Sequence, residues 1–406
     1  MVSFLPLVSI LEGKILKKKC LGILLGIAGI GIVVALYDRV QMKERLERDL
    51  YPVQTVFQKA GLKPESEKRY TKAGRVAWTV HLDPDKLRKN GYQFPYDKRE
   101  EDWLGRTYLP KETLEATLGQ DLSHQGTEVG IQAKRTDLKK ILAEKRLIAH
   151  AGGTMREAGF LSAYSNSLQA LKQNYSLGHR MFEFDLNLTQ DGRLAAVHDW
   201  ESDAPTSQDW EQSKTQDVNN IQAQYTTLFW EDILKQMELN PDMIVVTDTK
   251  VKDRTQEEIE EQYRILAQAV EKMDPSLADR ILVQLYKPED YQMLEEMGTF
   301  KNYILTLYAS EMKEEAIVKS LKDKPHILAV TLPQKDERLT DSLISQIHES
   351  NRLVFVHTVD GFATLSKILN RGIDGVYTNN LLSKDLELYQ EVVDSQKSFD
   401  IEVYQK

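Results

Sequence analysis

Two histidines that end apolar runs, His150 and His198, flank a closely spaced pair of carboxylates, Glu183 and Asp185. His150 closes the apolar run LIAHA, and His198 closes the run LAAVHD. Glu183 and Asp185 stand two positions apart in FEFDLNLT, so both side chains share one face if this run is a strand. Two histidines supply an acid and a base near neutral pH, and paired carboxylates bind a cation. The stretch therefore predicts a metal-assisted acid/base site, and hence an enzyme.

Apolar runs of strand length alternate with amphipathic helical stretches from Leu147 onward. Eight such runs occur: LIAHA, MFEFDLNL with LAAVHD, MIVVTDTK, ILVQLY, YILTLY, ILAVTLP, LVFVHTVD and GVYTNN. Strands and helices in alternation imply parallel strands with crossover helices, and eight units fit a (β/α)8 TIM barrel of about 250 residues. The alternative is an open doubly wound sheet, but no GxGxxG follows the first run, as a dinucleotide fold would require.

Polar residues recur in the later halves of these runs, where a barrel carries its active site. Besides those already named, they include Asp248, Lys250, Gln284, Tyr308 and His357. Three carboxylates converging inside a barrel, Glu183, Asp185 and Asp248, would repel one another unless a cation joined them. Because these are hard oxygen ligands without a cysteine partner, they favour Mg²⁺ or Ca²⁺ over Zn²⁺.

The order of these motifs resembles that of the glycerophosphodiester phosphodiesterase family, one of the phosphatidylinositol-phospholipase-like barrels. The matching segments, between about Leu147 and Leu382, are IAHAGG, YSNSLQALKQN, FEFDLNLTQDGRLAAVHD, VVTDTK, HTVD and DGVYTNN. The resemblance implies a TIM-barrel fold, a divalent metal and hydrolysis of a glycerol-linked phosphodiester. It further implies catalytic roles for His150, His198 and Lys250, and metal ligation by Glu183, Asp185 and Asp248.

Departures from the family pattern gather around phosphate recognition. Ala151 replaces the arginine that usually follows the first histidine, SNS replaces the usual ENT, and His357 stands where tryptophan is common. These departures indicate a divergent subfamily with a changed substrate, or alternatively a pseudoenzyme. Arg156, in the loop after the first run, and Lys250 are the candidates for the lost positive charge. Arg156, Gln284 and His357 are the predicted substrate-binding residues.

A basic leader at residues 1–19 precedes an uncharged apolar segment at 20–37. A helix over that segment would span about 27 Å, close to the roughly 30 Å hydrocarbon core of a bilayer. The segment predicts a single membrane anchor, because no polar face marks it as a core helix and no small-residue cleavage site marks a signal peptide. Basic residues flank both ends equally, but a short basic leader before one span favours the N-terminus inside and the catalytic domain outside the cytoplasm.

The rest of the chain divides into a predicted juxtamembrane subdomain at 38–146, the barrel at 147–390 and a C-terminal tail at 391–406. The net charge of -9 argues against a general nucleic-acid binder, which needs a basic surface. The single cysteine, Cys20, excludes a disulfide framework and leaves the compartment open.

Two functions follow from these observations. The first is a membrane-anchored, metal-dependent phosphodiesterase that cleaves a glycerophosphodiester, a lipid headgroup or a glycerol-phosphate envelope polymer by two-histidine catalysis. The second is a non-catalytic barrel that binds a phosphodiester-containing envelope polymer. The acid, the base and the metal ligands together favour catalysis, because a mere binding site has little need of all three.

Overall fold

The computed structural model describes residues 34–133, 137–157, 160–200, 203–212, 215–218, 221–251 and 254–399. These residues form two compact units. One unit comprises 34–61, 96–115 and 121–132, and the other comprises 62–95, 116–120 and the described residues from 133 onward. The domain boundaries expected from the sequence stay predictions.

The first unit combines short strands with helices. After a helix at 34–47, the strands β1 (Leu50–Pro52), β8 (Thr107–Pro110) and β7 (Glu100–Glu101) form an antiparallel sheet. The helix α2 (Val53–Lys59) follows β1, the helix α3 (Lys111–Leu118) follows β8, and a hairpin pairs β9 (Gln120–Gln125) with β10 (Glu128–Ala133). Leu46, Val56, Phe57 and Tyr108 are fully buried, which gives this unit a core of its own.

The N-terminal predictions fall largely outside the part of the chain that the structure describes. Of the predicted span at 20–37, only residues 34–37 are described, and the basic leader at 1–19 is not. Among the described residues, no helix is both long and apolar enough to cross a bilayer.

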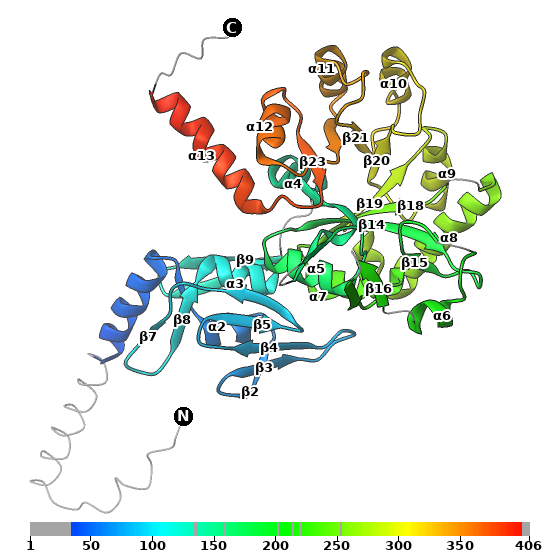
Figure 1. The fold of residues 1–406 in the computed structure, drawn as a ribbon. Helices are drawn as coiled ribbons and strands as arrows, with labels where there is room; N and C mark the ends of the chain where they lie inside the picture. The colour runs from blue at the N-terminus through cyan, green and yellow to red at the C-terminus, as the bar shows by residue number, and fades with distance from the viewer. Residues whose placement is uncertain are drawn as a thin grey trace, which may run out of the picture. The chain divides into compact units, whose positions relative to one another are not determined.

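The second unit begins with an antiparallel meander of five strands (Figure 1). They are β2 (Lys63–Ser66), β3 (Arg69–Lys72), β4 (Trp78–Leu82), β5 (Lys86–Lys89) and β6 (Tyr92–Pro95). Of these strands, only β4 lies in an apolar run of the sequence, RVAWTVHL, while the others are short and half-exposed. The meander contacts the barrel helix α7 (Trp230–Leu239): the Tyr92 hydroxyl donates to Gln236 Oε1 at 2.9 Å, and Lys89 Nζ donates to the Leu239 carbonyl at 2.9 Å.

Eight parallel strands form a closed barrel, which confirms the fold predicted from the sequence. In spatial order they are β11 (Leu147–Ala149), β14 (Met181–Leu188), β18 (Ile244–Thr249), β19 (Ile281–Leu285), β20 (Tyr303–Thr306), β21 (Ile327–Pro333), β22 (Leu353–His357) and β23 (Gly375–Thr378). Because β11 pairs with both β14 and β23, the sheet has no open parallel edge, and the doubly wound alternative is wrong. A short strand, β15 (Leu194–Ala196), pairs antiparallel with the carboxyl-terminal part of β14.

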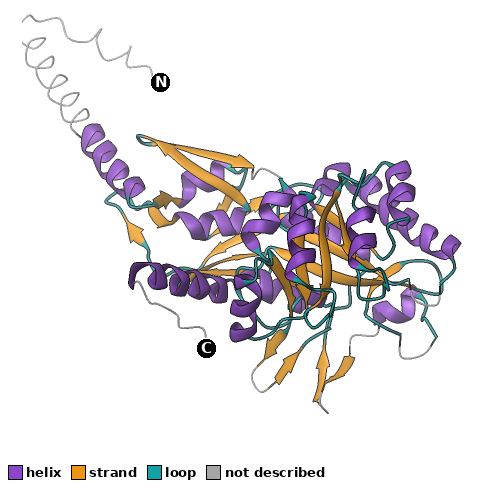
Figure 2. Cartoon of the chain, turned by 90° about the horizontal axis from the view of Figure 1, so that it is seen from above, coloured by secondary structure: helices purple, strands orange, loops and turns teal. Residues whose placement is uncertain are grey.

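Helices lie around these strands, as the ribbon shows from two directions (Figures 1 and 2). They are α5 (Leu168–Ser176), α7, α8 (Gln256–Met273), α9 (Asp290–Met297), α10 (Glu314–Ser320), α11 (Asp341–Glu349), α12 (Phe362–Asn370) and α13 (Ser383–Phe399). Hydroxyl side chains begin several of them: Thr255 and Glu258 form a capping box on α8, and Thr340 caps α11. The helix α13 continues past residue 390, where the sequence placed the end of the barrel.

Loops after β11 and β15 carry small elements of their own. A turn of 3-10 helix, η1 (His150–Gly152), follows β11 directly and leads to the hairpin of β12 (Met155–Glu157) and β13 (Phe160–Ser162). After β15 come α6 (Ser207–Gln212) and a second hairpin, β16 (Thr215–Val218) with β17 (Ile221–Gln224). These insertions follow carboxyl ends of strands or lie just beyond β14, where barrel enzymes place substrate loops.

The interior of the barrel changes from apolar to polar along every strand. At the amino end, the helix α4 (Leu138–Lys145) contributes Leu138 and Leu142 to one cluster with residues from all eight strands, among them Ile148, Met181, Val246, Leu282, Ile304, Ala329, Phe355 and Tyr377. Two positions further along stand polar residues: His150, Glu183, Asp248, Gln284, Thr306, Thr331, His357 and Asn379. Because side chains two apart share a face, the apolar layer supports a polar layer at the carboxyl ends.

Candidate active site

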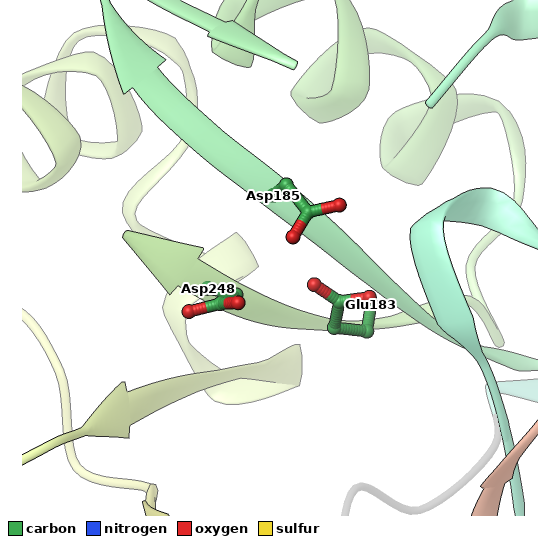
Figure 3. A group of neighbouring side chains, drawn as sticks. All are labelled: Glu183, Asp185 and Asp248. Carbon is green, nitrogen blue, oxygen red and sulfur yellow. The ribbon is translucent and has the colours of Figure 1, made fainter. Parts of the chain in front are cut away.

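Three carboxylates converge in that polar layer (Figure 3). Glu183 and Asp185 lie on β14, and Asp248 lies on β18 directly opposite Asp185 in the strand register. Each offers a ligand oxygen, and these oxygens all lie within 4.8 Å of one another. All three side chains are buried. The structure therefore brings together the residues that the sequence proposed as metal ligands.

Glu183 carries the charge that the protein compensates least. Its Oε2 accepts a hydrogen bond from the backbone N–H of Ala151 at 2.7 Å, but its buried Oε1 has no hydrogen-bond partner among the described residues. Burial, together with the charges of Asp185 and Asp248, raises the pKa of Glu183 well above its usual range. An oxygen left in this state is what a cation site presents before the ion is bound.

Lys250 balances part of the negative charge. Its ammonium lies 2.6 Å from Asp185 Oδ1 and 2.7 Å from Asp248 Oδ2. Burial lowers the pKa of Lys250, but the surrounding carboxylates outweigh this effect and raise it above its ordinary value. Three carboxylates against one ammonium leave two formal negative charges, which matches a divalent cation with oxygen ligands. The residues present thus fit Mg²⁺ or Ca²⁺.

Amide and hydroxyl groups hold two of the carboxylates in place. Asn166 Nδ2 donates to Asp185 Oδ2 at 2.8 Å, and Asn166 Oδ1 accepts from the backbone N–H of Asp185 at 3.1 Å. Gln284 Nε2 donates to Asp248 Oδ1 at 2.8 Å, and the Tyr286 hydroxyl donates to the same oxygen. Gln284 therefore orients a predicted metal ligand in this structure, and its expected contact with substrate stays a prediction.

His150 is fixed by a chain of hydrogen bonds that ends on a carboxylate. Asn379 Nδ2 donates to Asp360 Oδ2 at 2.9 Å, which turns the Asn379 amide oxygen toward the histidine. His150 Nδ1 lies 3.1 Å from that oxygen and donates to it, since an amide oxygen only accepts. Nε2 of His150 then faces the acidic cluster, 3.8 Å from Glu183 Oε2. The arrangement sets the ring orientation and tautomer of His150, as a carboxylate does for the histidine of a catalytic triad.

His198 is the more exposed of the two histidines, with 45% of its side chain accessible. Its Nδ1 lies 2.5 Å from Asp199 Oδ2, so its Nε2 is left for chemistry. The ring of Tyr164 lies between the two histidines, with centroid distances of 4.8 Å to His150 and 5.7 Å to His198. The structure therefore places both predicted catalytic histidines around one aromatic side chain.

The loop around Ala151 explains the HAGG sequence in steric terms. Ala151 is fully buried with a left-handed backbone, φ 50°, and its N–H is the one that reaches Glu183. Gly153 has φ 85°, and a Cβ atom there would lie 2.5 Å from Asn174 Nδ2. Glycine is therefore required at 153, because any side chain would displace the amide that pins this loop.

Arg156 braces the same loop. Its guanidinium donates to the Thr154 carbonyl at 3.0 Å, to Asn174 Oδ1 at 2.9 Å and to the Asn380 carbonyl at 2.8 Å. Burial lowers its pKa from the ordinary value, although nearby Asp385 opposes this. These contacts hold the guanidinium against loop carbonyls, and its predicted role as a phosphate ligand stays a prediction.

Arg254 is a further cation at this end of the barrel, and the sequence did not single it out. Its guanidinium donates to Asn187 Oδ1 at 2.7 Å. Asn187 follows Asp185 by two positions on β14 and so shares its face. The signal that points to Asn187 is the alternation itself, which continues one step beyond the carboxylate pair.

His357 lies at the end of β22 among aromatic rings. Tyr308 and Tyr377 contact it edge-on, with centroids 6.0 and 5.9 Å away. Its Nδ1 lies 2.9 Å from Thr331 Oγ1. Burial, reinforced by the charge of His150, lowers the pKa of His357 to about 4. His357 is therefore neutral at physiological pH and does not replace the missing positive charge, and its expected contact with substrate stays a prediction.

Comparison with known proteins identifies a family whose model matches the part of the chain that forms this site. Residues 150–383, more than half of the chain, match the model of the glycerophosphoryl diester phosphodiesterase family. No curated protein matches the chain. Similar solved structures include a glycerophosphodiester phosphodiesterase from Parabacteroides distasonis, at 20% identity, covering 61% of this chain and 98% of that one with a TM-score of 0.48.

Two further solved structures show the same extent of similarity. A putative glycerophosphoryl diester phosphodiesterase from Silicibacter pomeroyi is 13% identical, covering 61% of this chain and 93% of that one with a TM-score of 0.48. A phosphodiesterase from Oleispira antarctica, solved with the product sn-glycerol-3-phosphate, is 14% identical, covering 61% and 96% with a TM-score of 0.42. The match to the family model spans both histidines and all three carboxylates. The chain therefore belongs to the glycerophosphoryl diester phosphodiesterase family of hydrolases.

Proposed function

We propose that this protein is a membrane-anchored phosphodiesterase that cleaves glycerol-linked phosphodiesters with His150 and His198 as acid and base. The observation that carries the proposal is the convergence of these histidines on Tyr164, with His150 Nε2 3.8 Å from Glu183 Oε2. A barrel that only bound a polymer would have little use for an acid, a base and a cation site at one place.

The two histidines would act through proton transfer at their Nε2 atoms. One histidine, neutral, takes the proton of the attacking hydroxyl as the new oxygen–phosphorus bond forms. The other, protonated, gives its proton to the leaving oxygen as the old bond breaks. The attacking group is the neighbouring glycerol hydroxyl of the substrate, which gives a cyclic phosphate that water then opens, or it is water itself.

Other groups of the site would bind and orient the phosphodiester. A divalent cation held by Glu183, Asp185 and Asp248 supplies stabilisation of the negative charge that develops at phosphorus. Lys250 bridges Asp185 and Asp248, offsets the repulsion between them and adds positive charge. Neutral His357 offers a hydrogen bond to the glycerol part.

A direct test uses the purified full chain in detergent with glycerophosphocholine, glycerophosphoethanolamine or glycerophosphoglycerol. Phosphorus NMR follows the products, with Mg²⁺, with Ca²⁺ and with a chelator. We expect cleavage that the chelator abolishes, and a loss of at least about 100-fold in His150→Ala and His198→Ala. The matched control is His326→Ala, since His326 pairs with Glu295 on the surface. No cleavage of any of these diesters, or unchanged rates in the two variants, would contradict the proposal.

Membrane anchoring is a separate part of the proposal. The apolar segment at 20–37 supports a single span with the barrel outside the cytoplasm. Cell fractionation tests the anchor, since deletion of residues 20–37 should move the protein from the membrane to the soluble fraction. Protease added to intact cells tests the orientation: we expect it to digest the barrel, and full protection would reverse the assignment.

A further inference from the structure

Exposed apolar side chains gather at one end of the first unit. They belong to the first turns of the helix at 34–47 and to the loop between β7 and β8: Val34, Leu36, Tyr37, Val40, Trp103 and Leu104. Trp103 is 54% exposed and Leu104 is 52% exposed. Single exposed hydrophobic residues are ordinary on protein surfaces, but a gathered group of them marks an interaction site.

The loop is tied to the start of the helix. The guanidinium of Arg106 donates to both carboxylate oxygens of Asp38. At the other end of the hairpin, Glu100 pairs with Arg48 at 2.9 Å and Arg45 at 3.3 Å, both near the end of the helix. The hairpin of β7 and β8 therefore runs alongside the helix, with its tip at the helix's first turns (Figure 1).

The loop is also rigid at its base. The buried carboxylate of Asp102 accepts from the backbone N–H groups of Leu104 and Arg106 at 3.0 and 2.9 Å, and from Arg106 Nε at 2.6 Å. Gly105, with φ 74°, completes the turn by donating to the Asp102 carbonyl at 2.9 Å. Two large apolar side chains are thus held outward on a fixed turn, although nothing in the turn itself requires them to be apolar.

The position of Asp38 indicates which partner contacts the tip of the β7–β8 hairpin. The uncharged run of the sequence ends at Tyr37, so Asp38 is the first charged residue after it. At 1.5 Å per residue, the carboxylate that holds the loop lies within about 3 Å, measured along the helix axis, of the last aliphatic residue of the run. Tryptophan is enriched at this depth of a bilayer, where its ring spans the boundary between acyl chains and headgroups.

We infer that the loop Asp102–Arg106 is a second membrane contact, which inserts Trp103 and Leu104 into the lipid interface beside the anchor. This inference rests on the membrane anchor of the proposed function. The partner is a lipid bilayer and not a protein, because the exposed group continues an apolar segment of membrane-spanning length. The loop would hold the first unit against the bilayer surface at two points instead of one.

The test places the full chain in vesicles of phosphatidylcholine and phosphatidylglycerol whose acyl chains carry bromine, which quenches nearby tryptophan. The chain has five tryptophans. We expect bromine to remove up to about a fifth of the emission, and Trp103→Phe to abolish this loss, if Trp103 alone lies at the interface. The matched control is Trp200→Phe, because Trp200 Nε1 donates to the Leu188 carbonyl in the barrel unit. That variant should keep the quenching of the unchanged chain.

Flotation of the vesicles separates the possible failures. A chain that floats with the vesicles but shows equal quenching in Trp103→Phe overturns the loop inference and leaves the anchor standing. A chain that does not float overturns the anchor, and the loop inference with it. A third outcome would overturn the lipid contact in favour of a second copy of the chain. In it, the unchanged chain floats without being quenched, and Trp103→Phe has a smaller particle mass in detergent than the unchanged chain.

Discussion

The rings of Tyr164 and His150 stand nearly perpendicular, at 80°, with their centroids 4.8 Å apart. Tyr164 adopts a left-handed backbone, φ 61°, and this turns its side chain toward the histidines. Burial raises the pKa of the Tyr164 hydroxyl, while the side chain of Asn379, as a donor to the phenol oxygen, opposes the rise. Tyr164 therefore remains a neutral phenol near pH 7 and contacts the group that orients His150.

Two substitutions of Tyr164 should distinguish the contribution of its ring to activity from that of its hydroxyl. Tyr164→Ala removes the edge contact with both histidines, and we expect kcat/KM to fall by about 3- to 10-fold, the value of an aromatic pair. Tyr164→Phe keeps the ring and should retain most of the activity. Steady-state kinetics on a glycerophosphodiester checks both. Equal losses in the two variants would mean that the hydroxyl matters and the ring does not.

Asn379 should act on catalysis only through His150. Asn379→Leu removes the acceptor for His150 Nδ1, so the ring loses its preferred orientation. We expect kcat to fall by at least about 10-fold with a smaller change in KM, and the pH profile of kcat to shift. The control is Asn380→Ala, because only the backbone of Asn380 contacts Arg156. If Asn379→Leu lowers the melting temperature but leaves kcat and its pH profile unchanged, Asn379 is merely structural.

Glu183→Gln should stabilise the protein without metal and remove its response to metal. The substitution removes a buried carboxyl group that must either repel two other carboxylates or take up a proton at a cost, and an amide N–H donates to such neighbours. We expect the free energy of unfolding in chelator to rise by about 1 kcal/mol or more. Added Mg²⁺ or Ca²⁺ should raise the melting temperature of the unchanged protein but not that of the variant. A variant that melts at a lower temperature in chelator would argue against mutual repulsion at this site.

His179 should make the fold sensitive to acid. It is buried, its Nε2 lies 2.9 Å from the Leu381 carbonyl, and burial lowers its pKa to about 4. Because the unfolded chain binds this proton more readily, the stabilisation is complete above the unfolded pKa of about 6.5 and is lost as pH falls toward 4. The full loss is about 3 kcal/mol.

Urea unfolding at pH 7.5 and pH 5 checks this dependence. His179→Gln retains a side-chain donor for the Leu381 carbonyl but takes up no proton. The difference in stability between the two pH values should therefore be smaller in this variant than in the unchanged protein. An equal difference in both proteins would assign the acid sensitivity to other groups.

The barrel fold could be predicted from the sequence because the same strand and helix patterns repeat along it. Each strand is a short apolar run and each crossover is amphipathic, so eight similar units were visible in order. The convergence of Glu183, Asp185 and Asp248 followed from the same periodicity. Residues two apart on one strand share a face, and the carboxyl ends of neighbouring parallel strands lie at the same end of the barrel. Both predictions needed only local patterns and one topological rule.

Other parts of the site depend on contacts that no local pattern reports. Tyr164 and Asn166 reach the histidines and Asp185 from left-handed loop positions, φ 61° and 47°, outside any periodic element. Asp360 and Asn379 pair across 19 residues of sequence. The five-stranded meander escaped notice because strands of four or five residues, half-exposed, resemble loops.

The division of the chain into units bears on how it can be shortened and how it is synthesised. The chain changes units after residues 61, 95, 115, 120 and 132. A truncation that starts at the first barrel strand would therefore remove the whole meander from the second unit. It would also remove Lys89 and Tyr92, whose side chains donate hydrogen bonds to α7. It would also remove α4, leaving the apolar end of the barrel open to water. On the ribosome, the first unit is incomplete until residue 132 has emerged, so its assembly overlaps with that of the meander instead of preceding it.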